Sequence, residues 1–178
     1  MTATLFSTTM PSPIGVLTIV ADDGAIVAIR WDTESDEREP DARNPVDAWL
    51  GRRRAEVHEA PDHPVLAAAV TQLTEYFAGE RTAFDLPLAP AGTDFQRSAW
   101  ETLRGIPFGV TVSYGEQAAA MGDKRKARAV GAANGRNPIP IVVPCHRVVG
   151  SNGHLTGFAG GIEVKAWLLD HELRVRAS

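Results

Sequence analysis

A cysteine and a histidine stand side by side near the end of a proline-bounded apolar run. Residues 137–148 read NPIPIVVPCHRV, and the pair is Cys145 and His146. A thiol with a nearby imidazole is typical of nucleophilic sites, because the imidazole can accept the thiol proton. We expect an extended segment here, whose adjacent side chains point to opposite sides, so the proton would pass through a bridging water. The alternative is a buried, inert cysteine.

Cys145 is the only cysteine among the 178 residues. An intramolecular disulfide and a cysteine-rich zinc site are therefore excluded. Residues 1–15 contain no Lys or Arg and no long apolar core, unlike a signal peptide, and no apolar stretch is long enough to span a bilayer. We expect a soluble intracellular protein of one large or two small domains.

The two halves of the chain differ in charge. Residues 1–91 carry seven Arg and fifteen acidic residues, a net charge of −8. Residues 92–178 carry eleven basic and seven acidic residues, a net charge of +4. This asymmetry favours a polyanionic partner for the second half, although a solvated basic helix face would give the same pattern.

The elements around the reactive pair have clear local signals. Capping boxes begin at Thr93 and at Ser113, and each predicts the start of a helix. A short Ala-rich helix, a turn at Gly122 and a basic helix over 124–134 have helix-turn-helix spacing, a pattern that plain packing units share. The first predicted helix buries a face of Phe95, Ala99, Leu103 and Ile106; the third buries Ala127, Val130 and Ala133.

The first half predicts a small antiparallel sheet and one long helix that starts at Pro64. Parts of residues 32–63 are expected to be a long surface loop, although 47–54 could form a short helix. The expected strands are 4–10, 16–20 and 25–31, the long helix is 64–77, and 84–92 is an extended linker.

These motifs together resemble one family. The sequence PCHRV over 144–148 follows RAVG at 128–131 and NP at 137–138, with SYGE at 113–116 and GG at 160–161. The sequence resembles the O6-alkylguanine-DNA alkyltransferases (methylated-DNA–protein-cysteine methyltransferases) over essentially the whole chain.

The resemblance implies an α+β fold with an N-terminal ribonuclease-H-like α/β domain over 1–82, a linker over 83–92, and a mostly helical C-terminal domain with a helix-turn-helix over 93–178. It implies direct DNA repair: O6-alkylguanine is flipped out of double-stranded DNA, and its alkyl group passes irreversibly to Cys145, once per molecule. We expect no cofactor, no membrane association, and a cytoplasmic monomer, nucleoid-associated in a bacterium. Cooperativity on DNA stays open.

The resemblance also assigns catalytic roles. Cys145 would be the nucleophile, His146 would take its proton through water, and Glu172 would orient and charge-stabilise His146. Tyr114 would protonate the departing guanine, and Asn137 would tie the recognition helix to the active-site segment. Without the resemblance, Glu172 would be an exposed acid at a helix end, Tyr114 a packing residue, and Asn137 a turn residue.

DNA contacts and a base pocket are implied in the same way. Arg128 would fill the gap left by the extruded base, although it could equally be a solvated helix cation. The remaining expected DNA-binding residues are Lys124, Arg125, Lys126, Ala129, Gly131 and Arg136. The expected pocket residues are Pro140, Val148, Phe158 and Ala159.

The sequence departs from some relatives of the family. Ala159 replaces a Ser, which leaves the range of accepted alkyl groups open. The first half has no Cys beside His58 and His63, so we expect no zinc site. A non-catalytic lesion-binding protein and a Cys-dependent hydrolase remain as alternatives. We further expect the Cys145 pKa to lie below that of a free thiol, because a negative Glu172 favours proton transfer to His146.

Overall fold

The protein is described by a computed structural model over residues 3–32, 55–158 and 161–178. The chain divides into two compact units, Met1–Ala91 and Gly92–Ser178. The short helix expected over 47–54 lies outside the described residues. Within the described ranges, no helix has the length and apolar character needed to cross a membrane.

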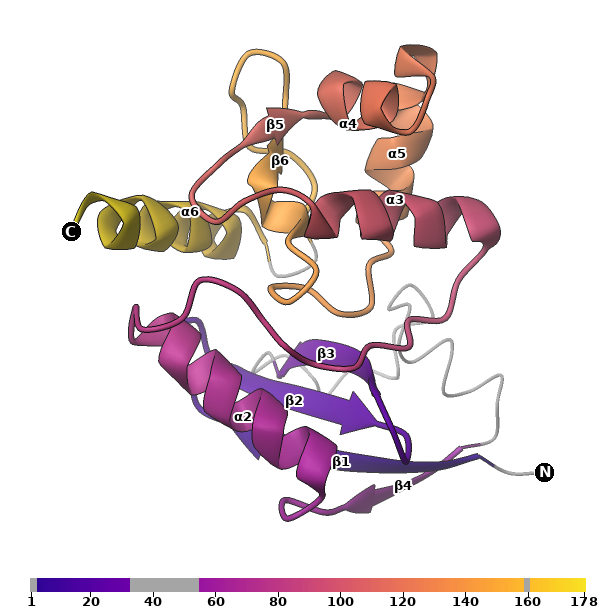
Figure 1. Ribbon diagram of the computed structural model, residues 1–178, viewed down its shortest axis with the longest axis vertical. Coiled ribbons are helices and arrows are strands. Elements are labelled where there is room, and N and C mark those ends of the chain that lie inside the picture. Colours follow the sequence, from indigo (N-terminus) through magenta and orange to yellow (C-terminus); the bar gives the residue numbers. More distant parts are fainter. Residues whose placement is uncertain (1–2, 33–54, 159–160) are drawn as a thin grey trace. The chain divides into compact units, whose positions relative to one another are not determined.

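In the described residues of the first unit, a four-stranded sheet has one helix packed on it (Figure 1). Its strand order is β3-β2-β1-β4, and the first three strands are antiparallel, as predicted. The turn before β3 is closed by Asp22, whose carboxylate accepts hydrogen bonds from the backbone of Gly24 and Ala25. The elements are β1 (Thr4–Met10), β2 (Val16–Ala21), β3 (Ile26–Asp32), β4 (Glu56–Glu59) and α2 (Pro64–Phe77).

Two segments of the first unit, one expected to be loop and one expected to be linker, form β pairing that the sequence did not predict. Strand β4 lies within residues 32–63, where the sequence predicted loop and no strand, and it pairs in parallel with β1. Its sequence EVHE is exposed throughout, so it has no alternating apolar pattern that would have revealed it. Residues 87–89 are extended as expected, but they also pair with the edge of the sheet, where Ile26 exchanges backbone hydrogen bonds of 2.8 Å with Pro87 and Ala89.

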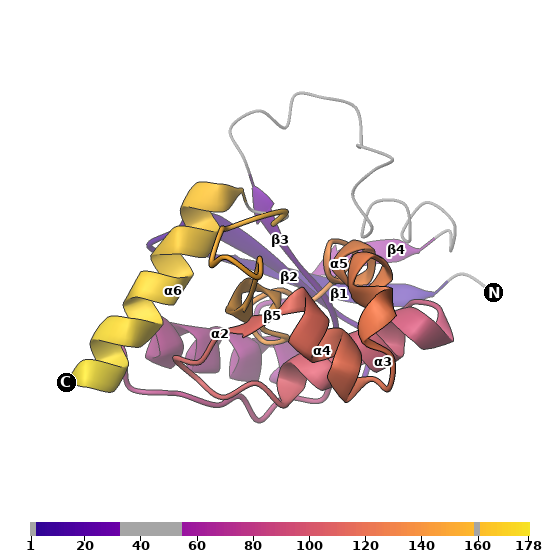
Figure 2. The ribbon, with the colours of Figure 1, turned by 90° about the horizontal axis from the view of Figure 1, so that it is seen from above.

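The second unit is mostly helical; Figure 1 shows its short β5–β6 pair, and Figure 2 shows β5 between α6 on one side and α3, α4 and α5 on the other. Both predicted capping boxes are present, at Thr93 and Ser113. The α+β class is confirmed. The elements are α3 (Asp94–Arg104), β5 (Val112–Ser113), α4 (Tyr114–Ala120), the 3-10 helix η1 (Lys124–Lys126), α5 (Ala127–Asn134), the 3-10 helix η2 (Cys145–Arg147), β6 (Val148–Val149) and α6 (Ile162–Ala177).

The helix-turn-helix pair α4–α5 is held by buried polar contacts. The turn uses Gly122 at a φ of 104°, a conformation that favours glycine. The side-chain amides of Gln117 and Asn134 exchange two hydrogen bonds, of 3.1 and 2.8 Å, between the helices. The Trp100 indole donates to the carbonyl of Ala133 at 2.8 Å, which ties α3 to α5. Fixed in this way, α5 presents a defined outer face.

Candidate active site

Cys145 begins a single 3-10 turn, η2, so the expectation of an extended segment is wrong. The turn is closed by Arg147, whose backbone N–H donates to the carbonyl of Pro144 at 3.1 Å. The backbone N–H of Cys145 donates to the carbonyl of Val143 at 2.8 Å. The two prolines at 140 and 144 made an extended run the natural prediction, whereas the chain turns at 141–142 and again at η2.

The segment before Cys145 is strained and is braced by Asn137. Ile141 has a φ of 72°, which is unusual for a β-branched residue, and it is fully buried. Asn137 Nδ2 donates to the carbonyl of Val143 at 2.8 Å, and its Oδ1 accepts from the backbone of Ile139 at 3.0 Å. Asn137 therefore fixes both limbs of the turn that positions Cys145.

Behind the turn lies a buried group of three charged or polar side chains, His146, Arg147 and Glu172, which we call the Glu172 cluster. His146 Nε2 lies 2.7 Å from Glu172 Oε1. Arg147 donates to both carboxylate oxygens, from Nη2 at 2.8 Å to Oε1 and from Nε at 2.9 Å to Oε2. The side chains of His146 and Glu172 are fully buried, and that of Arg147 is 7% exposed.

The cluster is anchored to the loop that follows α3. The backbone N–H of Gly109 donates to Glu172 Oε2 at 3.1 Å, and Arg147 Nη1 donates to the carbonyl of Ile106 at 2.7 Å. The Arg147 guanidinium also lies 5.6 Å from the ring centre of Phe108. Glu172 is thus a buried residue within α6, which excludes the alternative of an exposed acid at a helix end.

The cluster fixes the protonation of the imidazole. Although burial alone raises the pKa of Glu172, the hydrogen bonds from His146 and Arg147 hold it well below its usual value. The ionised carboxylate can only accept, so His146 Nε2 carries a proton. Burial lowers the pKa of His146, despite the opposing effect of Glu172, so the imidazole is neutral. Nδ1 is then a lone-pair acceptor, and it makes no hydrogen bond to the described residues.

The Cys145 thiol is protonated in this environment. Burial raises its pKa, and the opposing effects of Asn137 and Lys165 are smaller. The expectation of a pKa below that of a free thiol is therefore wrong, because Cys145 is only 8% exposed and its anion is poorly solvated. Reaction at sulfur consequently requires a base that takes the proton.

Lys165 is a functional candidate that the sequence did not suggest. Its side chain is fully buried, and Nζ donates to the carbonyls of Val148 and Thr156 at 2.7 and 2.9 Å. Burial lowers its pKa, while the thiolate form of Cys145 would favour the ammonium. Nζ also lies 5.9 Å from the ring centre of Tyr114. The sequence around Lys165, which lies within α6, gives no indication that this side chain is buried.

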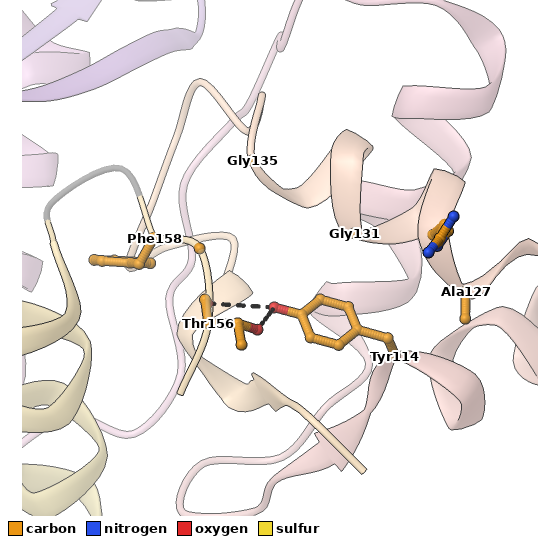
Figure 3. A pocket seen from close by; sticks show the side chains of 8 residues that line it. Tyr114, Ala127, Gly131, Gly135, Thr156 and Phe158 are labelled. Carbon is orange, nitrogen blue, oxygen red and sulfur yellow. Dashed lines mark hydrogen bonds between the residues drawn. The ribbon is translucent and has the colours of Figure 1, made fainter. Parts of the chain in front are cut away.

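A hollow of about 590 Å³ opens between α5 and the segment after β6 (Figure 3). Tyr114 reaches across it, and its hydroxyl lies 3.1 Å from Thr156 Oγ1 and donates to the carbonyl of Thr156 at 3.4 Å. Two of the expected DNA-contacting residues, Arg128 and Gly131, contribute to its wall. The lining residues are Tyr114, Ala127, Arg128, Gly131, Gly135, Thr156, Gly157 and Phe158.

The expected DNA-contacting residues are mostly on the surface. Lys124, Arg125 and Lys126 form the exposed turn η1. Asp123 accepts hydrogen bonds from the side chain and the backbone of Arg125, and these contacts lower the Asp123 pKa. The other exposed residues of the expected set are Arg128, Ala129 and Arg136.

The expected pocket residues have different environments. Phe158 lines the hollow, whereas Pro140 and Val148 are buried and are not among its lining residues. Ala159 lies outside the described residues. Cys145 is not among the lining residues either, but Lys165 links the two places, because it binds the Thr156 carbonyl and acts electrostatically on the thiol. No group of three or more potential metal-ligating side chains occurs within 3–32, 55–158 and 161–178.

Both units match domains of one known family. Residues 94–174 match the DNA binding domain of 6-O-methylguanine DNA methyltransferase, and residues 5–90 match its ribonuclease-like domain. The chain belongs to this family.

Relatives of known name agree with the 6-O-methylguanine DNA methyltransferase assignment. The methylated-DNA–protein-cysteine methyltransferase of Mycobacterium tuberculosis is 44% identical over 164 residues, 92% of this chain and 90% of that protein. The constitutive enzyme of the same name from Bacillus subtilis is 42% identical over 169 residues, 94% of each chain.

Solved structures of the family have the same fold. The crystal structure of the M. tuberculosis O6-methylguanine methyltransferase has a TM-score of 0.79 at 42% identity and covers 96% of this chain and 93% of that one. A structure of the M. tuberculosis protein in complex with DNA has a TM-score of 0.79 at 40% identity, covering 97% and 94%. The family resemblance and the two-part fold predicted from the sequence are confirmed.

Proposed function

We propose that this protein repairs alkylated DNA by transferring the alkyl group of O6-alkylguanine to Cys145, once per molecule. One arrangement carries the proposal: the only cysteine of the chain begins the turn η2, and the next residue, His146, is held by a buried carboxylate. The names of the relatives give the reaction class, and the DNA complex of the M. tuberculosis protein supports DNA as the partner.

The transfer step needs a proton acceptor and a departing group. The Cys145 proton passes through a water to His146 Nδ1, and the sulfur attacks the alkyl carbon. The S–C bond forms as the C–O6 bond breaks, and the electron pair stays on guanine O6. Tyr114 donates a proton to the guanine anion, and the imidazolium returns its proton to the phenolate through solvent. Glu172 stabilises the imidazolium while it exists.

The thioether product explains single use. A carbon–sulfur bond of this kind is not cleaved by any group proposed for the site, and the chain has no second cysteine to replace the first. The protein is therefore a transferase by chemistry and is consumed by its own reaction.

The DNA must deliver a base that is stacked inside the duplex. The helix α5 acts as the recognition helix, with Arg128 filling the space of the extruded nucleotide. The exposed cations of η1 and Arg136 bind phosphates, and the small residues Ala129 and Gly131 permit close approach of the backbone. The extruded base enters the hollow beside Tyr114 and Phe158.

Intact-protein mass spectrometry after incubation with duplex DNA containing O6-methylguanine tests the proposal. We expect one methyl group per protein, located on Cys145 by peptide mapping, and none on Cys145→Ser. DNA binding without methyl transfer would instead indicate a lesion-binding protein. Repeated turnover with unmodified protein would indicate a hydrolase. Either result would overturn the proposal.

A further inference from the structure

Arg147 holds the same carboxylate that orients the proposed base. Glu172 Oε1 accepts from His146 and from Arg147 Nη2, at 2.7 and 2.8 Å. The second oxygen accepts from Arg147 Nε at 2.9 Å. The arginine grips the carboxylate with two parallel bonds in a site that is almost closed to water, where charges interact strongly.

The charges of the Glu172 cluster balance only when His146 is neutral. With Arg147 and Glu172 both ionised, a neutral imidazole leaves the three side chains with no net charge. Without the guanidinium, the buried Glu172–His146 pair would have a net charge of −1, which burial disfavours. The pair would then bind one more proton, and that proton would occupy Nδ1, the nitrogen not used by Glu172.

We propose that Arg147 is a positioning residue for alkyl transfer, whose hold on Glu172 keeps this extra proton off the pair and leaves His146 Nδ1 free to accept the proton of Cys145. The inference rests on the proposed function, because it assumes that His146 is the base. It adds a role for a residue that contacts neither the thiol nor the hollow in the described structure.

The other groups around His146 do not replace Arg147. Lys165, from α6, carries a positive charge that also disfavours the imidazolium, but it binds two backbone carbonyls and not Glu172. Cys145 is neutral because burial raises its pKa. Helix α3 also packs against η2, and its charged side chains, Asp94, Arg97, Glu101 and Arg104, are exposed.

The protonation of His146 can be measured without DNA. Selective 13C labelling of histidine, with assignment by His146→Gln, would follow the imidazole by NMR as a function of pH. In wild-type protein we expect His146 to stay neutral well below the pH at which a free imidazole titrates. In Arg147→Gln it should titrate at higher pH, and in Arg147→Lys, which keeps the charge, it should behave as in wild type. Glu172→Gln should shift its titration in the opposite direction from Arg147→Gln.

The rate of alkyl transfer then tests the consequence. In single-turnover reactions Arg147→Gln should lose about tenfold at pH 7 if the His146 pKa rises about one unit above that pH, because the free-base fraction falls tenfold for each unit by which the pKa exceeds the pH, and the rate should recover toward high pH. Arg147→Lys should retain most of the wild-type rate and its pH profile. Arg174→Gln is the matched control, since it breaks an exposed arginine–carboxylate pair with Asp170 on the same helix.

The outcomes separate this inference from the proposed function. An equal rate loss at every pH, with His146 titrating as in wild type, would mean that Arg147 only supports the fold. A shifted His146 titration with an unchanged transfer rate would show that His146 is not the base, which overturns the proposed relay. If Arg147→Gln does not fold, the wild-type protein still decides, because a His146 found protonated at pH 7 would overturn the inference.

Discussion

The second unit uses its basic residues in two opposite environments. The basic surface, which comprises Lys124, Arg125, Lys126, Arg128 and Arg136, is exposed, and its charges face solvent. Arg147 and Lys165 are buried. Arg147 donates hydrogen bonds to the Ile106 carbonyl and to Glu172, and Lys165 donates to the carbonyls of Val148 and Thr156, at 2.7–2.9 Å. Exposed cations act through their combined charge, which salt screens, whereas the effect of a buried cation depends on the particular atoms that it contacts.

This difference separates the two tasks of the protein. Binding a phosphate backbone needs a positive surface of tolerant geometry, and loss of one cation leaves the others in place. Moving a single proton from sulfur needs one imidazole with one defined tautomer. We therefore expect substitutions in the Glu172 cluster and at Lys165 to have large, pH-dependent effects on the reaction or on stability. Substitutions on the basic surface should have smaller effects, which for DNA binding depend on salt.

The largest effect is expected for Glu172→Gln. Removing the carboxylate leaves the Arg147 guanidinium buried without a counter-charge, which costs about 3 kcal/mol of unfolding free energy. Because the pKa of Glu172 is lowered in the folded protein, its stabilisation is present above about pH 4 and is lost as the pH falls toward the folded-state pKa. Urea unfolding at pH 7 and at about pH 3, below the unfolded-state pKa of a glutamate, should show a larger loss of unfolding free energy in wild type than in the variant.

Exposed Glu163 in the first turn of α6 provides the control for this substitution. Glu163→Gln should change the unfolding free energy little at either pH. Glu172→Gln should also slow alkyl transfer at pH 7, and higher pH should recover part of the loss, because the thiol then ionises without the relay. Coincident rate profiles for wild type and Glu172→Gln would remove Glu172 from the mechanism.

The second-largest effect is expected for Lys165→Met. The substitution leaves the Val148 and Thr156 carbonyls without their donor and removes the positive charge that favours the Cys145 thiolate. The thiol pKa should rise further, and alkylation by iodoacetamide at pH 7 should slow by about tenfold. The rate measured against pH checks this result, with exposed Lys126→Met as the control. A rate profile like that of wild type would show that Lys165 holds the loop without acting on the sulfur.

Local signals made much of the second unit predictable, whereas the contacts of its buried cations had no local signal, and the pairing of Glu172 with His146 was expected only from the family resemblance. Both capping boxes are contained within four residues, and both are present as predicted. The partner of Arg147 lies 25 residues away and that of Lys165 lies 17 residues away, so no local pattern reports them. The turn η2 was missed for the same reason, since its shape depends on the bracing by Asn137 and not on the propensities of its own residues.

The third-largest effect is expected for Arg128, whose substitution tests the basic surface directly. Arg128→Ala should slow transfer from duplex DNA by about 10- to 100-fold, because an extruded base costs a few kcal/mol to unstack and we propose that the arginine fills its place. Reaction with free O6-alkylguanine base, which needs no extrusion, should change little. Single-turnover rates on both substrates check the prediction. Equal losses on the two would assign Arg128 to the pocket and not to extrusion.

The smallest effect is expected within the turn η1, where two neighbouring cations differ in their partners. Arg125 is already paired with Asp123, at 3.0 Å from Nε to Oδ1, whereas Lys126 has no carboxylate partner in the described residues and lies 5.8 Å from the ring centre of Phe95. A phosphate contact by Arg125 would compete with Asp123, so it should release less counterion. Lys126→Gln should lower the slope of log affinity against log salt by about 0.9, the value for one phosphate, and Arg125→Gln should lower it less. Fluorescence anisotropy with unmodified duplex DNA over a salt series measures both slopes.

Asp123→Asn provides the reciprocal test, because freeing Arg125 should steepen the slope. If Arg125→Gln lowers the slope as much as Lys126→Gln does, the Asp123 pairing has no effect on DNA binding and the basic surface acts by charge number alone.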